Sequence, residues 1–232
     1  MIDAVLFDLD DTLFDQRHWL AGAWRVVAAV GEGHGFDVAA FHAALVDIAA
    51  EGSARGGIID RALARVGARA LDVGPFVDAF KSHRPRRLPL YPGVHETLDQ
   101  LRRLVPLGLV TDGDPGIQRS KLAALELDDT FDVVVLSDEL GRDRRKPHAA
   151  PFQAALAGLG VEAARAVFVG DRPDKDVGGA QAAGLFAVRV RTGEYAALPD
   201  EPRAWRTVAG VAEAAAAIGP LLGQPQSDLS VL

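Results

Sequence analysis

The sequence of 232 residues contains no cysteine. This absence excludes disulfides, thiolate metal sites and cysteine nucleophiles. The N-terminus also lacks a basic segment followed by a long apolar run, so the sequence predicts no signal peptide. No apolar stretch is long enough to span a bilayer, which requires about 20 residues. We therefore expect a cytoplasmic protein that has no membrane partner.

Positive charge is also in short supply, because the formal net charge is -7. A general nucleic-acid binder would carry a basic surface, so we expect no nucleic-acid partner. A small anionic substrate stays possible, because a bound divalent cation can reverse the local field. The 6 histidines are scattered and form no pair at helical metal spacing, which favours structural or surface roles.

The composition and the pattern of the chain indicate an α/β protein with a sizeable core. Hydrophobic residues make up 49% of the chain and charged residues 25%, as in soluble globular domains. Short apolar runs alternate with helical periodicity, which predicts a doubly wound parallel sheet with helices on both faces. The expected strands are residues 4–7, 107–111, 133–136, 166–169 and 186–190, and the expected helices are residues 94–104, 117–125, 151–159, 177–183 and 209–218.

One block interrupts this alternation just after the first strand. Between about residues 16 and 88 no stretch reads as a strand, and apolar residues recur at helical spacing instead. The sequence therefore predicts a helical insertion at 16–88 and a core built from 1–15 and 89–232. The final residues, 219–232, are expected to form a loose tail.

Two carboxylates follow the first strand, at Asp8 and Asp10. Residues two apart on an extended chain point to the same side, so these side chains would repel each other. Such a pair needs a cation or a shared proton. The alternative is a simple acidic turn, because aspartate is common in turns.

Polar residues also follow other strands of the predicted sheet. Thr111 ends one strand, and Asp171 follows the strand at 166–169, with Asp176 shortly beyond. Ligands bind beyond the carboxyl ends of parallel strands, so these groups are expected to meet. Carboxylates from two strands suit Mg²⁺ better than zinc. Lys146, which lies in a polar segment ahead of a helix, could hold phosphate oxygens.

In this order and at this spacing, four motifs resemble those of the haloacid dehalogenase-like (HAD) superfamily, in its phosphatase branch. The motifs are Asp8-Leu9-Asp10-Asp11-Thr12, then Thr111, then Lys146, then Gly170-Asp171 with Asp176 beyond it, and the resemblance covers about residues 2–195. The helical insertion is similar to the small α-helical cap of that family.

The resemblance implies a covalent mechanism. Asp8 would attack phosphorus and form an aspartyl-phosphate. Asp10 would protonate the leaving oxygen and then activate water. Thr111 would donate a hydrogen bond to a phosphoryl oxygen, and Lys146 would offset negative charge.

The resemblance also implies a metal cofactor. Mg²⁺ would bind the Asp8 carboxylate, the Asp10 backbone carbonyl and Asp171. Asp176 would support the metal site or orient Lys146.

Some positions depart from the family pattern. Asp112 stands where the family often has asparagine, which could alter the substrate pocket or change nothing. Lys175 stands where many members carry asparagine or another polar residue, and we interpret it as the start of a surface helix. Arg142, Arg144 and Arg145 are expected to be solvated.

The sequence thus predicts a Mg²⁺-dependent phosphomonoester hydrolase for a small phosphorylated metabolite, such as a sugar phosphate or a nucleotide. We expect a monomer or a homodimer. Asp10 argues against the dehalogenase branch, because dehalogenation needs no proton for the leaving group. Two alternatives stay open: a binding or regulatory protein that keeps the fold without turnover, and a phosphotransferase.

Overall fold

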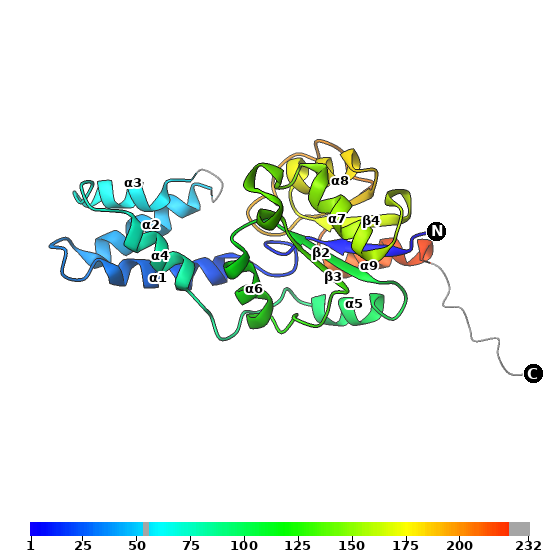
Figure 1. The fold of residues 1–232 in the computed structure, drawn as a ribbon, viewed down its shortest axis with the longest axis horizontal. Coiled ribbons are helices and arrows are strands. Elements are labelled where there is room, and N and C mark those ends of the chain that lie inside the picture. Colours follow the sequence, from blue (N-terminus) through cyan, green and yellow to red (C-terminus); the bar gives the residue numbers. More distant parts are fainter. Residues whose placement is uncertain (53–55, 223–232) are drawn as a thin grey trace, which may run out of the picture.

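The computed structural model of the protein describes residues 1–52 and 56–222 (Figure 1). Of the expected loose tail, residues 223–232 therefore lie outside the described residues. The described part contains a six-stranded sheet in the order β3-β2-β1-β4-β5-β6, and every neighbouring pair is parallel. The strands are β1 (Ala4–Phe7), β2 (Leu107–Thr111), β3 (Val133–Leu136), β4 (Ala166–Gly170), β5 (Phe186–Val190) and β6 (Arg206–Val208). The predicted doubly wound α/β fold is confirmed.

Helices surround this sheet and form the block that was expected between the first two strands. The α-helices are α1 (Arg17–Val30), α2 (Val38–Ala50), α3 (Ile58–Arg65), α4 (Gly74–Ser82), α5 (Val94–Leu101), α6 (Pro115–Ala124), α7 (Ala149–Leu159), α8 (Gly178–Ala182) and α9 (Val211–Ile218). Short helical turns are η2 (Ser137–Leu140), η3 (Arg142–Arg144), η4 (Ala163–Arg165), η5 (Pro173–Val177) and η6 (Gly219–Leu221). Among the described residues, none of these helices has the length and hydrophobicity that crossing a membrane requires.

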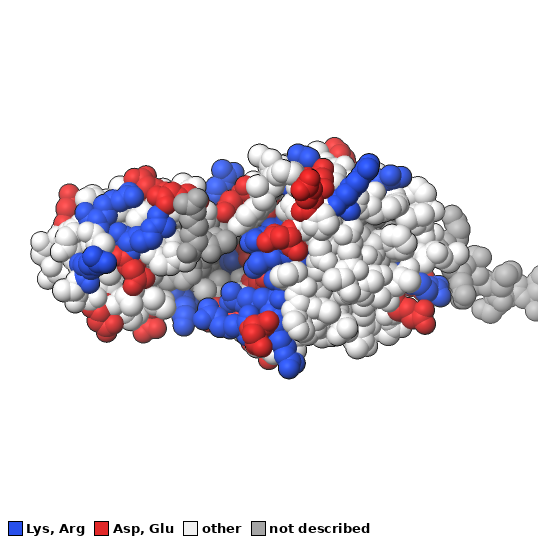
Figure 2. Space-filling model, turned by 90° about the horizontal axis from the view of Figure 1, so that it is seen from above, with Lys and Arg blue, Asp and Glu red and all other residues white. Residues whose placement is uncertain are grey.

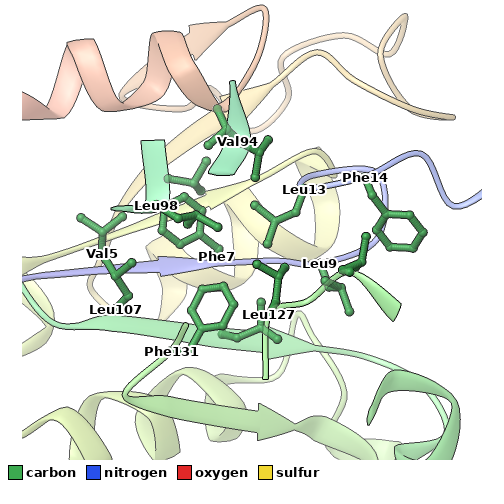
Figure 3. Close-up of a cluster of buried hydrophobic side chains, with 14 of the residues drawn as sticks. Val5, Phe7, Leu9, Leu13, Phe14, Val94, Leu98, Leu107, Leu127 and Phe131 are labelled. Atoms are coloured by element: carbon green, nitrogen blue, oxygen red, sulfur yellow. The ribbon is translucent and has the colours of Figure 1, made fainter. Parts of the chain in front are cut away.

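The two faces of the sheet are buried by different helices. Successive residues of a strand point to opposite faces. Val5 and Phe7 lie in one cluster with side chains of α5 (Figure 3) and also of α6 and α9. Ala4 and Leu6 lie in another cluster with side chains of α7 and α8. All four are fully buried, and burying a side chain such as Phe7 contributes about 1.5–3 kcal/mol. This double covering explains why β1 is apolar at every position.

The helices α1–α4 lie together to one side of the sheet (Figure 1). They have a hydrophobic cluster of their own, which includes Trp24, Phe41, Leu45 and Phe76. Phe41 and Phe76 meet edge to face, with ring centroids 5.5 Å apart. The block therefore packs around its own core while remaining joined to β1 and to α5.

One strand was not predicted from the sequence. β6 is three residues long, and its side chains are exposed or only half-buried. It pairs with β5 at the edge of the sheet, where Val188 lies opposite Arg206. A three-residue run without an apolar pattern does not indicate a strand in the sequence. β6 becomes a strand because it pairs with β5 in the folded chain.

Candidate active site

The order of the strands places a crevice at the carboxyl ends of β1 and β4. From β1 the sheet extends to β2 and β3 on one side and to β4, β5 and β6 on the other. Loops that leave neighbouring strands in opposite directions open a crevice at this point, where ligands bind in such folds. A cavity of about 230 Å³ lies there. Its lining includes all six residues predicted for the site, namely Asp8, Asp10, Thr111, Lys146, Asp171 and Asp176.

Asp8 and Lys146 form the centre of this cavity. The Asp8 backbone N–H donates to the Val169 carbonyl (2.9 Å), which extends the β1–β4 pairing as far as the carboxylate. Lys146 Nζ lies 2.5 Å from Asp8 Oδ1 and 2.8 Å from Asp176 Oδ1. Burial raises the pKa of Asp8 to about 7, although Lys146 opposes this rise. Burial lowers the pKa of Lys146, but Asp176 and Asp8 outweigh it, so the lysine stays charged.

Three buried carboxylates meet within reach of a single cation. Oxygens of Asp8, Asp171 and Asp176 lie within 4.8 Å of one another. Asp171 Oδ2 is buried and accepts no hydrogen bond from any described residue. Burial, with the charges of Asp176 and Asp8, raises the pKa of Asp171 well above its usual value. An orphaned oxygen among repelling carboxylates fits a divalent cation with oxygen ligands.

The three carboxylates have different partners. Asp176 Oδ2 accepts from the Arg172 backbone N–H (3.0 Å), and its Oδ1 lies 2.8 Å from Lys146 Nζ but, like Asp171 Oδ2, accepts no hydrogen bond of good geometry from the described residues. Asp8 also has a neighbour on each oxygen, with Lys146 at Oδ1 and the Thr12 hydroxyl 3.4 Å from Oδ2. Each of the three could offer an oxygen to a cation. Among the described residues, carboxylates outnumber cationic side chains in the lining of the cavity, six to four.

The Asp10 carboxylate has partners of its own. Lys121 Nζ lies 2.6 and 2.9 Å from its two oxygens, and Gln118 Nε2 donates to Oδ2 (2.9 Å). The repulsion expected between Asp8 and Asp10 is therefore relieved by two separate lysines. Lys121 and Gln118 were not predicted from the sequence. Residues three apart lie on the same face of a helix, so the sequence indicated that Gln118 and Lys121 share a face of α6. It did not indicate that this face would meet Asp10.

Lys175 is not a simple surface residue, contrary to the interpretation of its sequence position. Its Nζ lies 2.9 Å from Asp112 Oδ2, and both residues line the cavity. Asp112 Oδ1 also accepts from the Ser137 hydroxyl (2.7 Å) and from the Lys146 backbone N–H (3.1 Å). Asp112 thus connects three separate segments of the chain next to Lys146.

Arg145 also differs from its expected solvated state. It lines the cavity, and its guanidinium donates to both oxygens of Asp138 (2.5 and 2.6 Å). The two residues are seven apart, and the turns η2 and η3 bring them together. This pair braces the segment that leads to Lys146.

The model of a family described as haloacid dehalogenase-like hydrolase matches residues 2–184. The chain belongs to this family. A glyceraldehyde 3-phosphate phosphatase from Methanopyrus kandleri is 38% identical to it over 211 residues, which is 88% of this chain and 89% of the relative. A phosphoglycolate phosphatase from Rhodospirillum rubrum is 33% identical over 237 residues, or 97% of this chain and 93% of the relative.

Solved structures of the haloacid dehalogenase-like fold agree with the arrangement of this chain. A HAD phosphatase from Thermococcus onnurineus has a TM-score of 0.66 at 26% identity and covers 94% of this chain and 98% of its own. A 2-haloacid dehalogenase from Pseudomonas syringae pv. Tomato has a TM-score of 0.64 at 25% identity and covers 95% of this chain and 100% of its own. One fold is therefore shared by a phosphatase and a dehalogenase, so the fold alone does not tell which reaction a chain catalyses and the residues of the site must be considered.

In this haloacid dehalogenase-like chain the loop after β5 completes the site, which the sequence did not reveal. Tyr195 lines the cavity and packs on Arg172, whose guanidinium carbon lies 4.3 Å from the ring centroid. Gly193 has a φ of +64°, and a Cβ there would lie 2.1 Å from Asp11 Cγ. The loop therefore depends on a glycine to approach the first motif.

A second cavity of about 520 Å³ adjoins the first and shares Asp11 and Gln16 with it. Its other walls come from α1, α2 and the loop after β5, and they include the apolar side chains of Leu20 and Trp24. Charged side chains gather at the junction of the helical block and the sheet unit (Figure 2). This family member thus has a small polar cavity next to a larger, more apolar one.

Proposed function

We propose that the protein is a Mg²⁺-dependent phosphomonoester hydrolase that acts on a small phosphorylated metabolite. The observation that carries the proposal is the group of Asp8, Asp171 and Lys146 at the carboxyl ends of β1 and β4. It joins a buried carboxylate, an orphaned carboxylate oxygen and a buried ammonium within one cavity. The names of the relatives, which are phosphatases of small metabolites, support the same reaction class.

The first step transfers the phosphoryl group to Asp8. An Asp8 oxygen attacks phosphorus, the bond from phosphorus to the leaving oxygen breaks, and Asp10 gives its proton to that oxygen. The products of this step are a free alcohol and an aspartyl-phosphate. Thr111 donates a hydrogen bond to a phosphoryl oxygen, and Lys146 balances negative charge beside Asp8.

The second step returns the enzyme to its starting state. Water attacks phosphorus, the bond from phosphorus to Asp8 breaks, and the Asp10 carboxylate accepts the proton of the water. Inorganic phosphate leaves, and both aspartates are ready for another turnover. Asp10 thus acts first as an acid and then as a base, which requires a group held close to the leaving oxygen.

The metal would be held by Asp8, Asp171 and the Asp10 backbone carbonyl, with Asp176 orienting Lys146 beside it. When bound, Mg²⁺ supplies positive charge that lets an anionic nucleophile approach an anionic phosphate. We assign residues 16–88 as a cap over the core of residues 1–15 and 89–232. The second cavity, between this cap and the core, is the place where the organic part of the substrate would lie.

Asp10 favours phosphate hydrolysis over dehalogenation. A halide leaves without a proton, whereas an alkoxide needs one, and Asp10 supplies an acid two residues from the nucleophile. A chain that cleaved 2-chloropropionate but no phosphomonoester would contradict the proposal. Transfer to acceptor alcohols instead of water would show as a phosphorylated acceptor among the products.

The replacement Asp8→Asn tests the nucleophile. We expect turnover of a small sugar phosphate with Mg²⁺ to fall by at least about 10³-fold, as when other covalent nucleophiles are removed. The purified wild type, quenched in acid during turnover, should carry labelled phosphate, and the variant should carry none.

A matched control is Asp3→Asn, because Asp3 precedes the same strand and pairs with Arg165 far from the cavity. This control should keep its turnover. An Asp8→Asn variant that remained fully active would refute the assignment, as would a wild type with no activity on a broad panel of phosphorylated metabolites.

A further inference from the structure

Two side chains of α6 hold the Asp10 carboxylate, and the mechanism above uses neither. Lys121 Nζ contacts both oxygens of Asp10 (2.6 and 2.9 Å), and Gln118 Nε2 donates to Oδ2 (2.9 Å). The Lys121 side chain is only 7% exposed and the Asp10 side chain 21%. Both carboxylate oxygens are therefore held in a fixed place by donors from one helix.

Two aromatic rings also lie near the Lys121 ammonium. Its Nζ lies 4.9 Å from the Trp19 ring centroid and 5.9 Å from that of Phe14. A buried ammonium without a partner is strongly destabilising, so this lysine depends on the carboxylate in front of it. A methionine would fill the same space without the charge, which makes the position suitable for a test.

Gln118 links Asp10 to a second residue of the site. The same Nε2 that donates to Asp10 also donates to the Thr111 hydroxyl (2.6 Å). Gln118 is 1% exposed, so its amide cannot turn to water for other partners. The Gln118 amide therefore fixes the position of the Asp10 carboxyl relative to the Thr111 hydroxyl.

We propose that Lys121 and Gln118 are positioning residues for the transfer of the proton to the leaving group. They hold the Asp10 carboxyl at the leaving oxygen, and Lys121 balances the negative charge that remains on Asp10 after its proton has moved to that oxygen. This inference rests on the proposed phosphatase function. It adds a buried cation that acts through Asp10 alone, whereas Gln118 acts through both Asp10 and Thr111.

The test compares two leaving groups in the variant Lys121→Met. An alkyl phosphate, such as ethyl phosphate, needs a proton on its leaving oxygen, whereas p-nitrophenyl phosphate releases a stable phenolate without one. We expect kcat/KM for the alkyl ester, which reports only the steps up to release of the alcohol, to fall by about 10²-fold, the lower end of the range for general acid–base catalysis. The loss for the aryl ester should stay below about threefold.

Further variants separate positioning from a structural role. Asp10→Asn should show the same dependence on the leaving group in kcat/KM, whereas its kcat should fall for both esters because the second step uses Asp10 as a base. Adding Lys121→Met to Asp10→Asn should lower kcat/KM no further. Gln118→Met should lower kcat for both esters, because it releases Thr111 as well. Lys121→Arg, which keeps the charge, should retain more activity on the alkyl ester than Lys121→Met.

The matched control is Arg119→Met, an exposed position on the same helix that pairs with Glu139 and lies outside the cavity. Its rates should equal those of the wild type for both esters. Equal losses of kcat/KM for the two esters in Lys121→Met, or no loss at all, would overturn the inference while leaving the phosphatase function in place. A wild type inactive on every phosphate ester would overturn both.

Discussion

Lys146 contacts two carboxylates at once, although it lies far from both in the sequence. Its Nζ is 2.5 Å from Asp8 and 2.8 Å from Asp176, and its side chain is 3% exposed. A compact ammonium can sit between two carboxylates at this distance, whereas a planar guanidinium would need more room. The residue type and its place in the order of motifs are visible in the sequence, but the pairing with Asp176 is not.

The charged residues around Lys146 were the least predictable part of the site. Arg145 and Lys175 were interpreted as surface residues, yet both line the cavity in ion pairs. Short runs of charge usually remain in solvent, and the sequence offered no reason to choose otherwise. Their partners, Asp138 and Asp112, come from different loops, so only the folded chain brings the charges together.

The ion pair of Asp138 with Arg145 should make the stability of the protein depend on pH. Burial raises the pKa of Asp138, but hydrogen bonds from Arg145 outweigh burial, so the pKa lies below its usual value. A carboxyl with a lowered folded-state pKa stabilises the fold above its unfolded pKa, near 3.9, and loses this effect as pH falls through the folded value. Asp138→Asn should therefore lower the free energy of unfolding by about 1–3 kcal/mol at pH 7.

Urea unfolding at pH 7 and under strongly acidic conditions measures this effect. The difference between wild type and Asp138→Asn should shrink toward zero in acid, because the carboxyl is then protonated in both states. Asp143→Asn, at an exposed position nearby, serves as the control and should change little at either pH. A difference that is equal at both pH values would show that the Asp138 charge is not the cause.

At the scale of elements, local signals located the helices better than their ends. α6 was expected from residue 117, but it begins at Pro115 because Asp114 caps it. The Asp114 side chain accepts from the backbone N–H groups of Gly116 (2.9 Å) and Ile117 (3.2 Å). An aspartate followed by proline is a common start for a helix, so this boundary was readable in the sequence.

The end of β4 depends on a glycine. A Cβ at Gly170 would lie 2.5 Å from Cγ and Oδ2 of Asp176. The backbone there is extended, so the constraint comes from the approach of Asp176 and not from φ. This close contact is what lets Asp176 reach Lys146 from the turn after the strand.

The variant Gly170→Ala tests this close contact. The added methyl should push Asp176 away and lower the free energy of unfolding by about 1–3 kcal/mol, as overpacking does. Activity should fall as well, because Lys146 loses one of its two partners. Chemical unfolding and steady-state kinetics measure the two effects.

Gly210→Ala is the control for this change, because no atom lies within 4 Å of a Cβ built there and its φ is not positive. Its stability and activity should match those of the wild type. If Gly170→Ala had the same stability and activity as Gly210→Ala, the close contact between residue 170 and Asp176 would not be important for either property.

In the whole molecule, the helices α1–α4 lie together to one side of the sheet (Figure 1), and the cavity lies at the carboxyl ends of the central strands β1 and β4. Charges of both signs gather at the junction of the helical block and the sheet unit, while the rest of the sheet unit is less charged on the face seen from above (Figure 2). Three buried carboxylates in one place oppose folding unless a cation neutralises them. The stability of the whole chain should therefore depend on the metal.

We expect Mg²⁺ to raise the melting temperature of the metal-free protein. At about 100 times Kd, a ligand that binds only the folded state adds about 2.7 kcal/mol, which corresponds to a rise of roughly 5–10 °C for a chain of this size. Scanning calorimetry with and without Mg²⁺ measures the shift. Asp171→Asn should abolish most of it, because the orphaned carboxylate oxygen is lost.

The control for this measurement is Asp174→Asn, in the same turn. Asp174 pairs with Arg172, and its side chain is 61% exposed. It should keep the full Mg²⁺ shift. A wild type whose melting temperature ignored Mg²⁺, or an Asp171→Asn variant with an undiminished shift, would contradict a cation at this place.

Sequence patterns were enough to predict β1 to β5, the run of helices after β1, and the positions of Asp8, Thr111 and Asp171 at the ends of strands. These features follow from local patterns, because burial on both faces imposes apolar strands and parallel strands end at one edge. The partner of each charge, such as Lys121 for Asp10 and Lys175 for Asp112, became known only from the folded chain. The pairing of charges depends on distances between segments remote in sequence, and the packing of helices against the sheet sets those distances.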